Sequence, residues 1–250
     1  MRALLIDIEA APAQAFIWAL RDQYIPLQRI IDNGYVLCVA AQWLGEDEIH
    51  FTSVKKDGRA KMLRKVHKMI SEADVVIHFN GTSYDMPMLN REFLTAGMTP
   101  PAPYKQIDLL KVARKRFRFL SNKMDYIAQI LGLKRKVRHK GFELWVECMR
   151  GDETAWKEME EYNIGDIHTL LAVYQKFLPW IQNHPNWGIF GRDLVCPNCG
   201  GKHFQFRGTA TVKTRQYRRA QCLADGCGKW FRSSIPVEAK KQERFVEIAA

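Results

Sequence analysis

Two acidic residues lie close together at the end of the first apolar segment. Asp7 lies in the apolar run at residues 3–8, and Glu9 directly follows it. The length and apolar character of this run predict a buried strand. Because side chains alternate between the two faces of a strand, residues two apart point to the same side. Two neighbouring carboxylates repel each other unless a cation lies between them, and hard cations such as Mg²⁺ bind carboxylate oxygens. The pair indicates a divalent metal site, the alternative being an edge strand that faces water.

A third candidate acid follows a second apolar segment. Asp85 ends the sequence Asn80-Gly81-Thr82-Ser83-Tyr84-Asp85, directly after residues 73–79, which are predicted to form a strand. A helix is predicted from about residue 86 to 96, so Asp85 stands at a strand-to-helix junction. At such a junction the carboxylate either joins a site at the end of the sheet or caps the helix.

A fourth acid and a phenol belong to a long predicted helix at residues 153–181. Tyr162 and Asp166 are four residues apart, which places both on one helix face, so that both can look into one site. Gly165 costs about 1 kcal/mol relative to Ala in a helix interior, which favours a close approach of the backbone to the sheet or to a ligand. The alternative is an incidental surface pair.

The order and context of these three segments resemble a known enzyme family. Asp7-Ile8-Glu9, then residues 80–85, then Tyr162 with Asp166 resemble the DEDD family of 3′–5′ exonucleases, in the subclass with Tyr in the third motif. That family belongs to the RNase H-like superfamily and includes the proofreading domains of family B DNA polymerases. Residues 121–133 are similar to the stretch between the second and third motifs of these enzymes. The resemblance covers about the first 180 residues; Ala10 and Tyr84 depart from it, where many relatives have Thr and Phe.

The resemblance implies a fold, a site and a reaction. The fold is α/β, an RNase H-like mixed sheet flanked by helices. Asp7, Glu9, Asp85 and Asp166 would hold two Mg²⁺ or Mn²⁺ ions, with Asp7 shared between them, and Tyr162 would orient the attacking water. Asn80 would contact the substrate. The expected reaction is hydrolysis of single-stranded DNA from its 3′ end with release of nucleoside 5′-monophosphates.

Two alternatives remain open at the level of the sequence. One is a 3′–5′ exoribonuclease or a structure-selective nuclease, since the acids do not themselves distinguish the sugar. The other is a non-catalytic nucleic-acid-binding module with a vestigial nuclease core, against which the presence of all four acids and the Tyr argues. The expected partner is nucleic acid, with DNA preferred over RNA. Action beside a polymerase or replication complex is also compatible with the sequence.

Four cysteines near the C-terminus have the spacing of a metal site. Cys196 and Cys199 are separated by two residues, Cys222 and Cys227 by four, and 22 residues lie between the pairs. Four thiolates make a closed tetrahedral Zn²⁺ site of structural type, the alternative being disulfides. One structural Zn²⁺ in a small four-cysteine zinc ribbon is therefore predicted, with His203 outside the ligand set. Cys38 and Cys148 are predicted to be small buried hydrophobic residues.

The ribbon carries interleaved aromatic and basic residues. Residues 204–207 and 212–219 are predicted to be its two strands, and aromatic rings there could stack on bases while cations meet phosphates. The alternative is that the aromatics form the small core and the charges are solvated. The predicted nucleic-acid contacts are Arg207, Lys213, Arg215, Tyr217, Arg218, Arg219 and Trp230.

The overall charge agrees with a polyanionic partner. The 250-residue chain has a formal net charge of +11. Residues 189–250 hold 12 Lys and Arg against 5 Asp and Glu, and the first 188 residues hold 26 against 22, so the C-terminal part is the more basic. A further basic run at residues 134–140 is a candidate path for the strand or a solvated loop. With no apolar run of about 18 residues and no signal peptide, the expectation is a cytoplasmic protein without a membrane partner.

The remaining pattern supplies the elements that would position these residues. Residues 34–43 and 48–54 are predicted to be paired strands that turn at residues 45–47, and residues 59–71, 107–119 and 123–131 to be helices. Breakers at residues 184–188 mark a linker. The predicted domains are an exonuclease domain at residues 1–188, a zinc ribbon at 189–235 and a C-terminal tail at 236–250.

Overall fold

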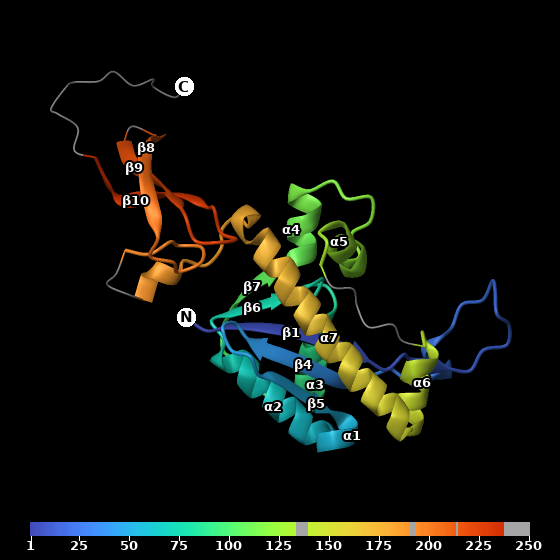
Figure 1. Cartoon of the computed structure of the whole chain (residues 1–250). Helices are drawn as coiled ribbons and strands as arrows, with labels where there is room; N and C mark the ends of the chain where they lie inside the picture. The colour runs from blue at the N-terminus through green and yellow to red at the C-terminus, as the bar shows by residue number, and fades with distance from the viewer. Residues whose placement is uncertain (134–139, 191–193, 214, 238–250) are drawn as a thin grey trace, which may run out of the picture. The chain divides into compact units, whose positions relative to one another are not determined.

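The computed structural model describes residues 1–133, 140–190, 194–213 and 215–237 (Figure 1). The chain divides into two compact units, Met1–Tyr174 and Gln175–Ala250. The predicted domain boundary at residue 188 stays a prediction. Within the described ranges, every helix is too short or too polar to cross a bilayer.

The first unit is built on a five-stranded mixed sheet with the order β5-β4-β1-β6-β7. The antiparallel part pairs β1 with β4 and β4 with β5, and the parallel part pairs β1 with β6 and β6 with β7. The strands are β1 Ala3–Ala10, β4 Val36–Trp43, β5 Ile49–Ser53, β6 Val75–His78 and β7 Lys105–Asp108. The predicted α/β fold with a mixed sheet and flanking helices is confirmed.

Helices cover both faces of this sheet. On one face Leu4, Ile6 and Ile8 of β1 pack in a buried core with residues of α2 (Arg59–Glu72) and α3 (Asp85–Thr95). On the other face α6 (Glu143–Arg150) and α7 (Glu153–Phe177) form a second core with Leu37 and Cys38 of β4. Figure 1 shows α7 running across the sheet. Alternation along β1 therefore leaves Asp7 and Glu9 on the α7 side.

Shorter elements connect these layers. They are β2 Gln14–Ala15, the 3₁₀ helix η1 Leu27–Arg29, β3 Ile30–Asp32, α1 Val54–Asp57, α4 Leu109–Arg116 and α5 Met124–Ile130. The two cysteines outside the C-terminal cluster, Cys38 and Cys148, are both buried, as predicted.

Most predicted elements agree with the structure within two or three residues, and the differences have local causes. The predicted helix at residues 107–119 was wrong at its start, because β7 extends to Asp108, which then caps α4 through hydrogen bonds from the Leu110 and Lys111 amides. The long helix ends at Phe177 instead of residue 181, because Pro179 lies in the following 3₁₀ helix η2, Leu178–Trp180. Helix α6 and the β2–β3 pair were not predicted.

The second unit contains a three-stranded antiparallel sheet with the order β10-β9-β8. The strands are β8 Phe204–Val212, β9 Arg215–Cys222 and β10 Trp230–Pro236, preceded by the 3₁₀ helix η3 Trp187–Phe190. Strands were predicted at residues 204–207 and 212–219; β8 extends further, to Val212, β9 begins later, at Arg215, and β10 was not predicted.

Candidate active site

Three of the predicted acids come together at the sheet. Asp7 and Glu9 lie in the C-terminal half of β1, and Asp166 reaches them from α7. Each offers one carboxylate oxygen, and these oxygens all lie within 4.8 Å of one another. Asp166 is buried and the other two are half-buried. The arrangement concentrates negative charge in a place that water reaches only in part.

Two uncharged side chains donate hydrogen bonds to the carboxylates of Asp7 and Glu9. Asn163 donates from Nδ2 to Oδ2 of Asp7 at 2.8 Å, and Trp145 of α6 donates from its indole Nε1 to Oε2 of Glu9 at 3.1 Å. Hydrogen bonds of this kind orient a carboxylate without neutralising it. Neither residue was predicted, although Asn163 stands between Tyr162 and Asp166 and so lies near both in any helix.

Tyr162 lies beside the acids on the same helix. Its side chain is 8% exposed, and its ring meets the Trp145 ring edge-on at 5.9 Å between centroids. It packs in the core that contains Ala11 and Leu37, next to the strand ends. The phenol and Asp166 are thus delivered by one helix, one turn apart.

Asp85 is the first residue of α3 and is 5% exposed. It is not a member of the group of three. Burial raises the pKa of its carboxyl to about 6, although backbone N–H groups of Asp85 itself and of Ile8 act in the opposite direction. Since Ile8 stands between Asp7 and Glu9, the Asp85 carboxyl lies beside β1. The helix-cap alternative does not hold, because the N-cap is Tyr84 and makes no side-chain cap hydrogen bond.

Tyr84, which departs from the family pattern, also lies near the acids. It is 48% exposed, and its pKa is raised by burial and by the charges of Glu9 and Asp85. The ring therefore stands at the rim of the acidic site, partly open to solvent.

The turn that carries Asp85 is fixed by Asp108 at the end of β7. The Asp108 carboxylate accepts hydrogen bonds from the backbone N–H of Asn80 at 3.0 Å and from that of Thr82 at 3.3 Å. Asn80 adopts a left-handed φ of 68°, which Asn tolerates better than most residues. The structure thus gives Asn80 a place in the turn, and its predicted contact with substrate stays a prediction. Sequence reasoning missed Asp108, although an Asp before Leu-Leu-Lys is a helix N-cap signal.

A buried histidine completes this turn. His78 accepts at Nδ1 from the Gly81 N–H at 3.0 Å, and its Nε2 lies 3.0 Å from Oε1 of Gln106 on β7. Burial lowers the pKa of His78, so the neutral ring with an accepting Nδ1 is favoured. A Cβ at position 81 would lie 2.4 Å from the His78 ring, so this position requires glycine.

Comparison with known proteins places this geometry in a family. A family model of the RNase H superfamily matches residues 31–178, more than half of the chain. The chain belongs to the RNase H superfamily. Asp7 and Glu9 precede the matched residues, so their relation to Asp166 rests on the structure. No curated protein matches the sequence significantly.

One solved structure similar to this RNase H superfamily protein is a family B DNA polymerase from the hyperthermophilic archaeon Pyrobaculum calidifontis. The TM-score is 0.55 at 17% identity, over 71% of this chain and 24% of that chain. The chain thus spans about a quarter of the polymerase's length. At this identity the likeness shows the fold alone.

The acidic cluster of this RNase H superfamily protein fits a hard divalent cation. Its donors are carboxylate oxygens from Asp7, Glu9 and Asp166, the ligand type that Mg²⁺ and Mn²⁺ prefer. Asn163 and Trp145 orient Asp7 and Glu9 through neutral donors, which leaves both groups able to act as charged oxygen ligands. These three residues could hold a metal ion, with Asp85 beside them.

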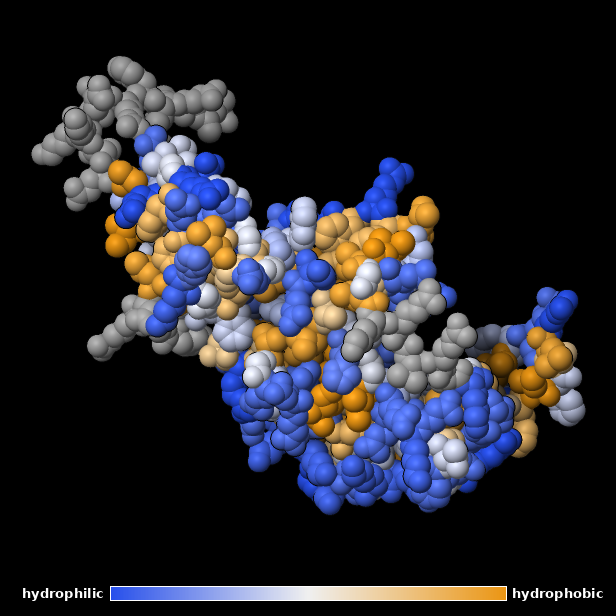
Figure 2. All heavy atoms as spheres, viewed as in Figure 1, coloured by the Kyte–Doolittle hydropathy of each residue, from blue (hydrophilic) through white to orange (hydrophobic). Residues whose placement is uncertain are grey.

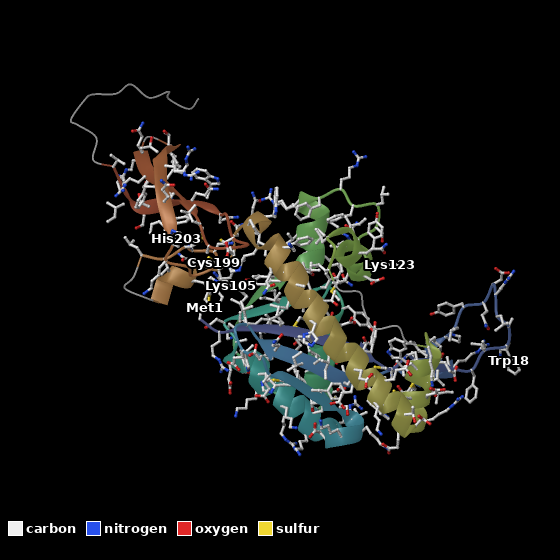
Figure 3. All side chains as sticks on the ribbon, in the orientation of Figure 1. Met1, Trp18, Lys105, Lys123, Cys199 and His203 are labelled. Carbon is white, nitrogen blue, oxygen red and sulfur yellow. The ribbon has the colours of Figure 1, made fainter. Side chains whose placement is uncertain are left out.

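The four C-terminal cysteines fit a tetrahedral Zn²⁺ site. Their Sγ atoms all lie within 4.8 Å of one another, with 3.8 Å between Cys196 and Cys227 and 3.6 Å between Cys199 and Cys222. A tetrahedron with Zn–S bonds of about 2.3 Å has edges of about 3.8 Å. His203, labelled with Cys199 in Figure 3, is not in this group, and its backbone carbonyl accepts from Leu223 N at 2.9 Å.

The three-stranded sheet β8–β10, called the ribbon here, has two chemically different faces. On one face Phe204 meets Phe206 and Phe231 edge-on at 5.7 and 5.5 Å, and this face lines a cavity of about 570 Å³. These rings pack on one another, as the core alternative expected. Arg218 stacks over Phe206 at 3.6 Å on the same face.

The opposite face of the ribbon is cationic. Arg219 lies over the Trp230 ring at 4.8 Å, and Arg232 over the Tyr217 ring at 4.1 Å. Arg207 is exposed on this face and donates to Gln221 Oε1 at 2.9 Å. The exposed residues Lys213 and Arg215 flank the β8–β9 turn. Of the basic run at 134–140, residues 134–139 lie outside the described residues, and Lys140 pairs with Glu147 at 3.2 Å.

Proposed function

We propose that the protein is a metal-dependent 3′–5′ exonuclease of the DEDD type with Tyr in the third motif, acting on DNA and preferring single strands. The observation that carries the proposal is the convergence of Asp7, Glu9 and Asp166 within 4.8 Å, from a strand and a helix far apart in sequence. The RNase H superfamily membership and the likeness to a DNA polymerase fold support the same interpretation.

The residues present divide the work of hydrolysis. Two bound Mg²⁺ or Mn²⁺ ions would supply charge neutralisation for an in-line displacement at phosphorus. Asp7, Glu9 and Asp166 would bind them, and Asp85 would join once its carboxyl has lost its proton. Tyr162 lies beside Asp166, where its hydroxyl would orient the attacking water. The bond from phosphorus to the 3′ oxygen breaks, and a nucleoside 5′-monophosphate leaves.

A polarity assay tests this proposal. Single strands of DNA and RNA of equal length, labelled at the 5′ end, are incubated with Mg²⁺; shortening that proceeds step by step from the 3′ end, faster on DNA, is expected. Asp7→Asn and Asp166→Asn should each slow release by at least about 1000-fold while the protein stays folded. Asp47→Asn, which removes an exposed turn carboxylate, is the control and should be as active as wild type.

Each alternative predicts a different result in the same assay. Preferred digestion of RNA would favour an exoribonuclease. Tight binding without mononucleotide release would favour a non-catalytic module, and wild-type rates in both Asn variants would remove the acids from the reaction.

The same proposal assigns the second unit a supporting role. The four-cysteine group would bind one structural Zn²⁺, and the face with Arg207, Arg219 and Arg232 would hold the phosphate backbone. The fold likeness to a polymerase is also compatible with action beside a polymerase or replication complex. One zinc per chain after metal-replete expression, lost in Cys199→Ser, is the expected metal content.

A further inference from the structure

A projecting segment between β1 and β4 exposes an unusual number of apolar side chains. This segment, residues 12–33, is called the arm; it contains β2, η1 and β3 and stands out from the sheet in Figure 1. Phe16 is 71% exposed, Trp18 87% and Tyr24 83%. Figure 3 shows Trp18 on the arm, away from the sheet, and Figure 2 shows apolar residues gathered at that place. Exposed apolar groups of this extent mark an interaction site.

The arm is rooted at the acidic site. The arm begins at residue 12, two residues after the end of β1, and returns through Gly34, close to where it began. Ala11 N donates to Tyr35 O at 2.8 Å, and Arg91 of α3 donates to Gly34 O at 2.6 Å. Gly34 has a φ of 70°, and a Cβ there would lie 2.4 Å from Ala11 O. The two ends of the arm are therefore in direct backbone contact. The base of the arm is therefore fixed relative to the acids.

The outer part of the arm is also ordered by its own hydrogen bonds. Phe16 N donates to Arg29 O at 2.9 Å, which continues the β2–β3 pairing. Gln23 closes the tip, since its Oε1 accepts from Trp18 N at 3.3 Å and its Nε2 donates to Ala19 O. The rings are thus presented by a structured hairpin, which reduces the entropy lost when a ligand binds them.

The chemistry of the arm selects bases over phosphates. Arg21 and Arg29 are balanced by Asp22 and Asp32, so the arm has no net formal charge to attract a polyanion. Flat exposed rings are the groups on which unpaired bases stack, without regard to sequence. Trp18 is nine residues beyond Glu9, at most about 30 Å of extended chain. At about 3.4 Å per stacked nucleotide this distance covers roughly nine nucleotides.

We infer that the arm is a stacking platform for the unpaired bases of the strand whose 3′ end occupies the acidic site, a few nucleotides upstream of that end. The inference rests on the proposed function for the direction of the strand. Its experiment measures binding alone, so it can fail or succeed independently of hydrolysis.

The test is a scan of abasic sites in single-stranded DNA, with affinity measured without divalent cations. Trp18→Ala should bind intact DNA roughly 5- to 100-fold more weakly than wild type. The slope of affinity against salt should stay the same, since a lost ring releases no counterions. Abasic sites within about nine nucleotides of the 3′ end should weaken binding by wild type and leave binding by Trp18→Ala unaffected. Trp18→Phe should restore part of the affinity, and Leu94→Ala, at an apolar residue of α3 that is 77% exposed, should match wild type.

Other outcomes separate the explanations. Equal effects of abasic sites on wild type and Trp18→Ala would overturn the inference. So would a dimer in sedimentation that Trp18→Ala dissociates without weakening DNA binding, which would make the arm a self-association surface. If the abasic pattern holds but no mononucleotides are released, the stacking platform stands and the exonuclease proposal fails. If mononucleotides are released but the abasic pattern is missing, the exonuclease proposal stands and the stacking platform fails.

Discussion

At the scale of single residues, Asn163 and Trp145 orient two of the carboxylates of the acidic site. The Trp145 indole donates to Glu9 at 3.1 Å, and its ring also meets Tyr162. Through these two contacts Trp145 of α6 connects β1, which carries Glu9, to α7, which carries Tyr162 and Asp166. The two contributions of Trp145 can be separated, because only one of them needs the N–H group.

Trp145→Phe keeps an aromatic ring and removes the donor, so it should affect metal binding more than folding. We expect the Mg²⁺ concentration for half-maximal activity to rise roughly 10-fold or more, as is typical when a hydrogen bond to a metal ligand is lost. Trp156→Phe is a matched control, since its indole donates to the Cys148 carbonyl at 2.9 Å, away from the acids. It should cost about 1 kcal/mol of stability and leave the Mg²⁺ dependence unchanged. Equal Mg²⁺ dependence in both variants would contradict the assignment.

The raised pKa of Asp85 predicts that the free energy of unfolding depends on pH when Mg²⁺ is absent. Its pKa is raised from 3.8 to about 6 by burial, so the folded state holds the proton more tightly than the unfolded state. The stabilisation is complete below about pH 4 and is lost as the pH rises through about 6. Asp85→Asn stays neutral, so its advantage over wild type should grow with pH to at most ~3 kcal/mol.

Urea denaturation from about pH 4 to 8, with zinc present and Mg²⁺ absent, measures this difference. Asp57→Asn is a control of opposite sign, because hydrogen bonds from Lys65 and Thr52 lower the pKa of Asp57 to about 2. That variant should be less stable than wild type above about pH 4. A stability difference for Asp85→Asn that does not change with pH would rule out the raised pKa.

At the scale of elements, the turn between β6 and α3 sets where Asp85 stands. A Cβ at Gly81 would lie 2.4 Å from Cγ of His78, and this ring is fully buried and in contact with Gln106. Gly81→Ala should therefore displace the turn, with a loss of roughly 1–3 kcal/mol and of at least about 100-fold in hydrolysis.

Gly97→Ala serves as the comparison, since Gly97 has a φ of 70° but open space around its Cβ position. It should cost about 1 kcal/mol through backbone strain and keep its activity. Denaturation midpoints and initial rates of both variants decide the matter. Unchanged hydrolysis by a folded Gly81→Ala protein would show that the turn tolerates displacement.

The elements with a clear period could be predicted from the sequence. Strand β4 is buried along its whole length and is apolar apart from Gln42, and α2 shows helical spacing in Met62, Val66 and Ile70. The predicted helix from residue 107 failed because the four residues of β7 are too few to show a strand period. The arm could not be predicted, because its exposed rings follow neither period and depend on Gln23 and Gly34 for their presentation.

The sequence could predict three acidic residues that the structure brings together, but not the groups that orient them. Residues two apart share one face of a strand, and residues four apart share one face of a helix. The pairing of Asp7 with Glu9 and of Tyr162 with Asp166 therefore follows from the sequence. The groups that orient them come from tertiary contacts, as with Trp145, which is 136 residues from Glu9. No local pattern contains such a pair.

At the scale of the whole molecule, the residues proposed for catalysis and those proposed for holding the substrate belong to different units. The acids belong to Met1–Tyr174, and the cationic ribbon face belongs to Gln175–Ala250. A change at the ribbon should therefore alter how well substrate is bound, and not the rate of the bound complex. If the chain binds nucleic acid as proposed, its net charge of +11 should make this binding strongly dependent on salt.

The double variant Arg219→Gln with Arg232→Gln tests this division. Both side chains are exposed or half-exposed beside Trp230 and Tyr217, and replacing them leaves the four-cysteine group intact. If each contacts one phosphate, KM should rise roughly 10- to 100-fold near physiological salt while kcat stays within about twofold. The slope of log affinity against log salt should fall in magnitude by about 2. Lys61→Gln with Lys68→Gln on α2 removes the same charge and should change neither the slope nor KM beyond about twofold. An equal shift in both double variants would mean that the protein binds nucleic acid through its overall charge and not through the ribbon face.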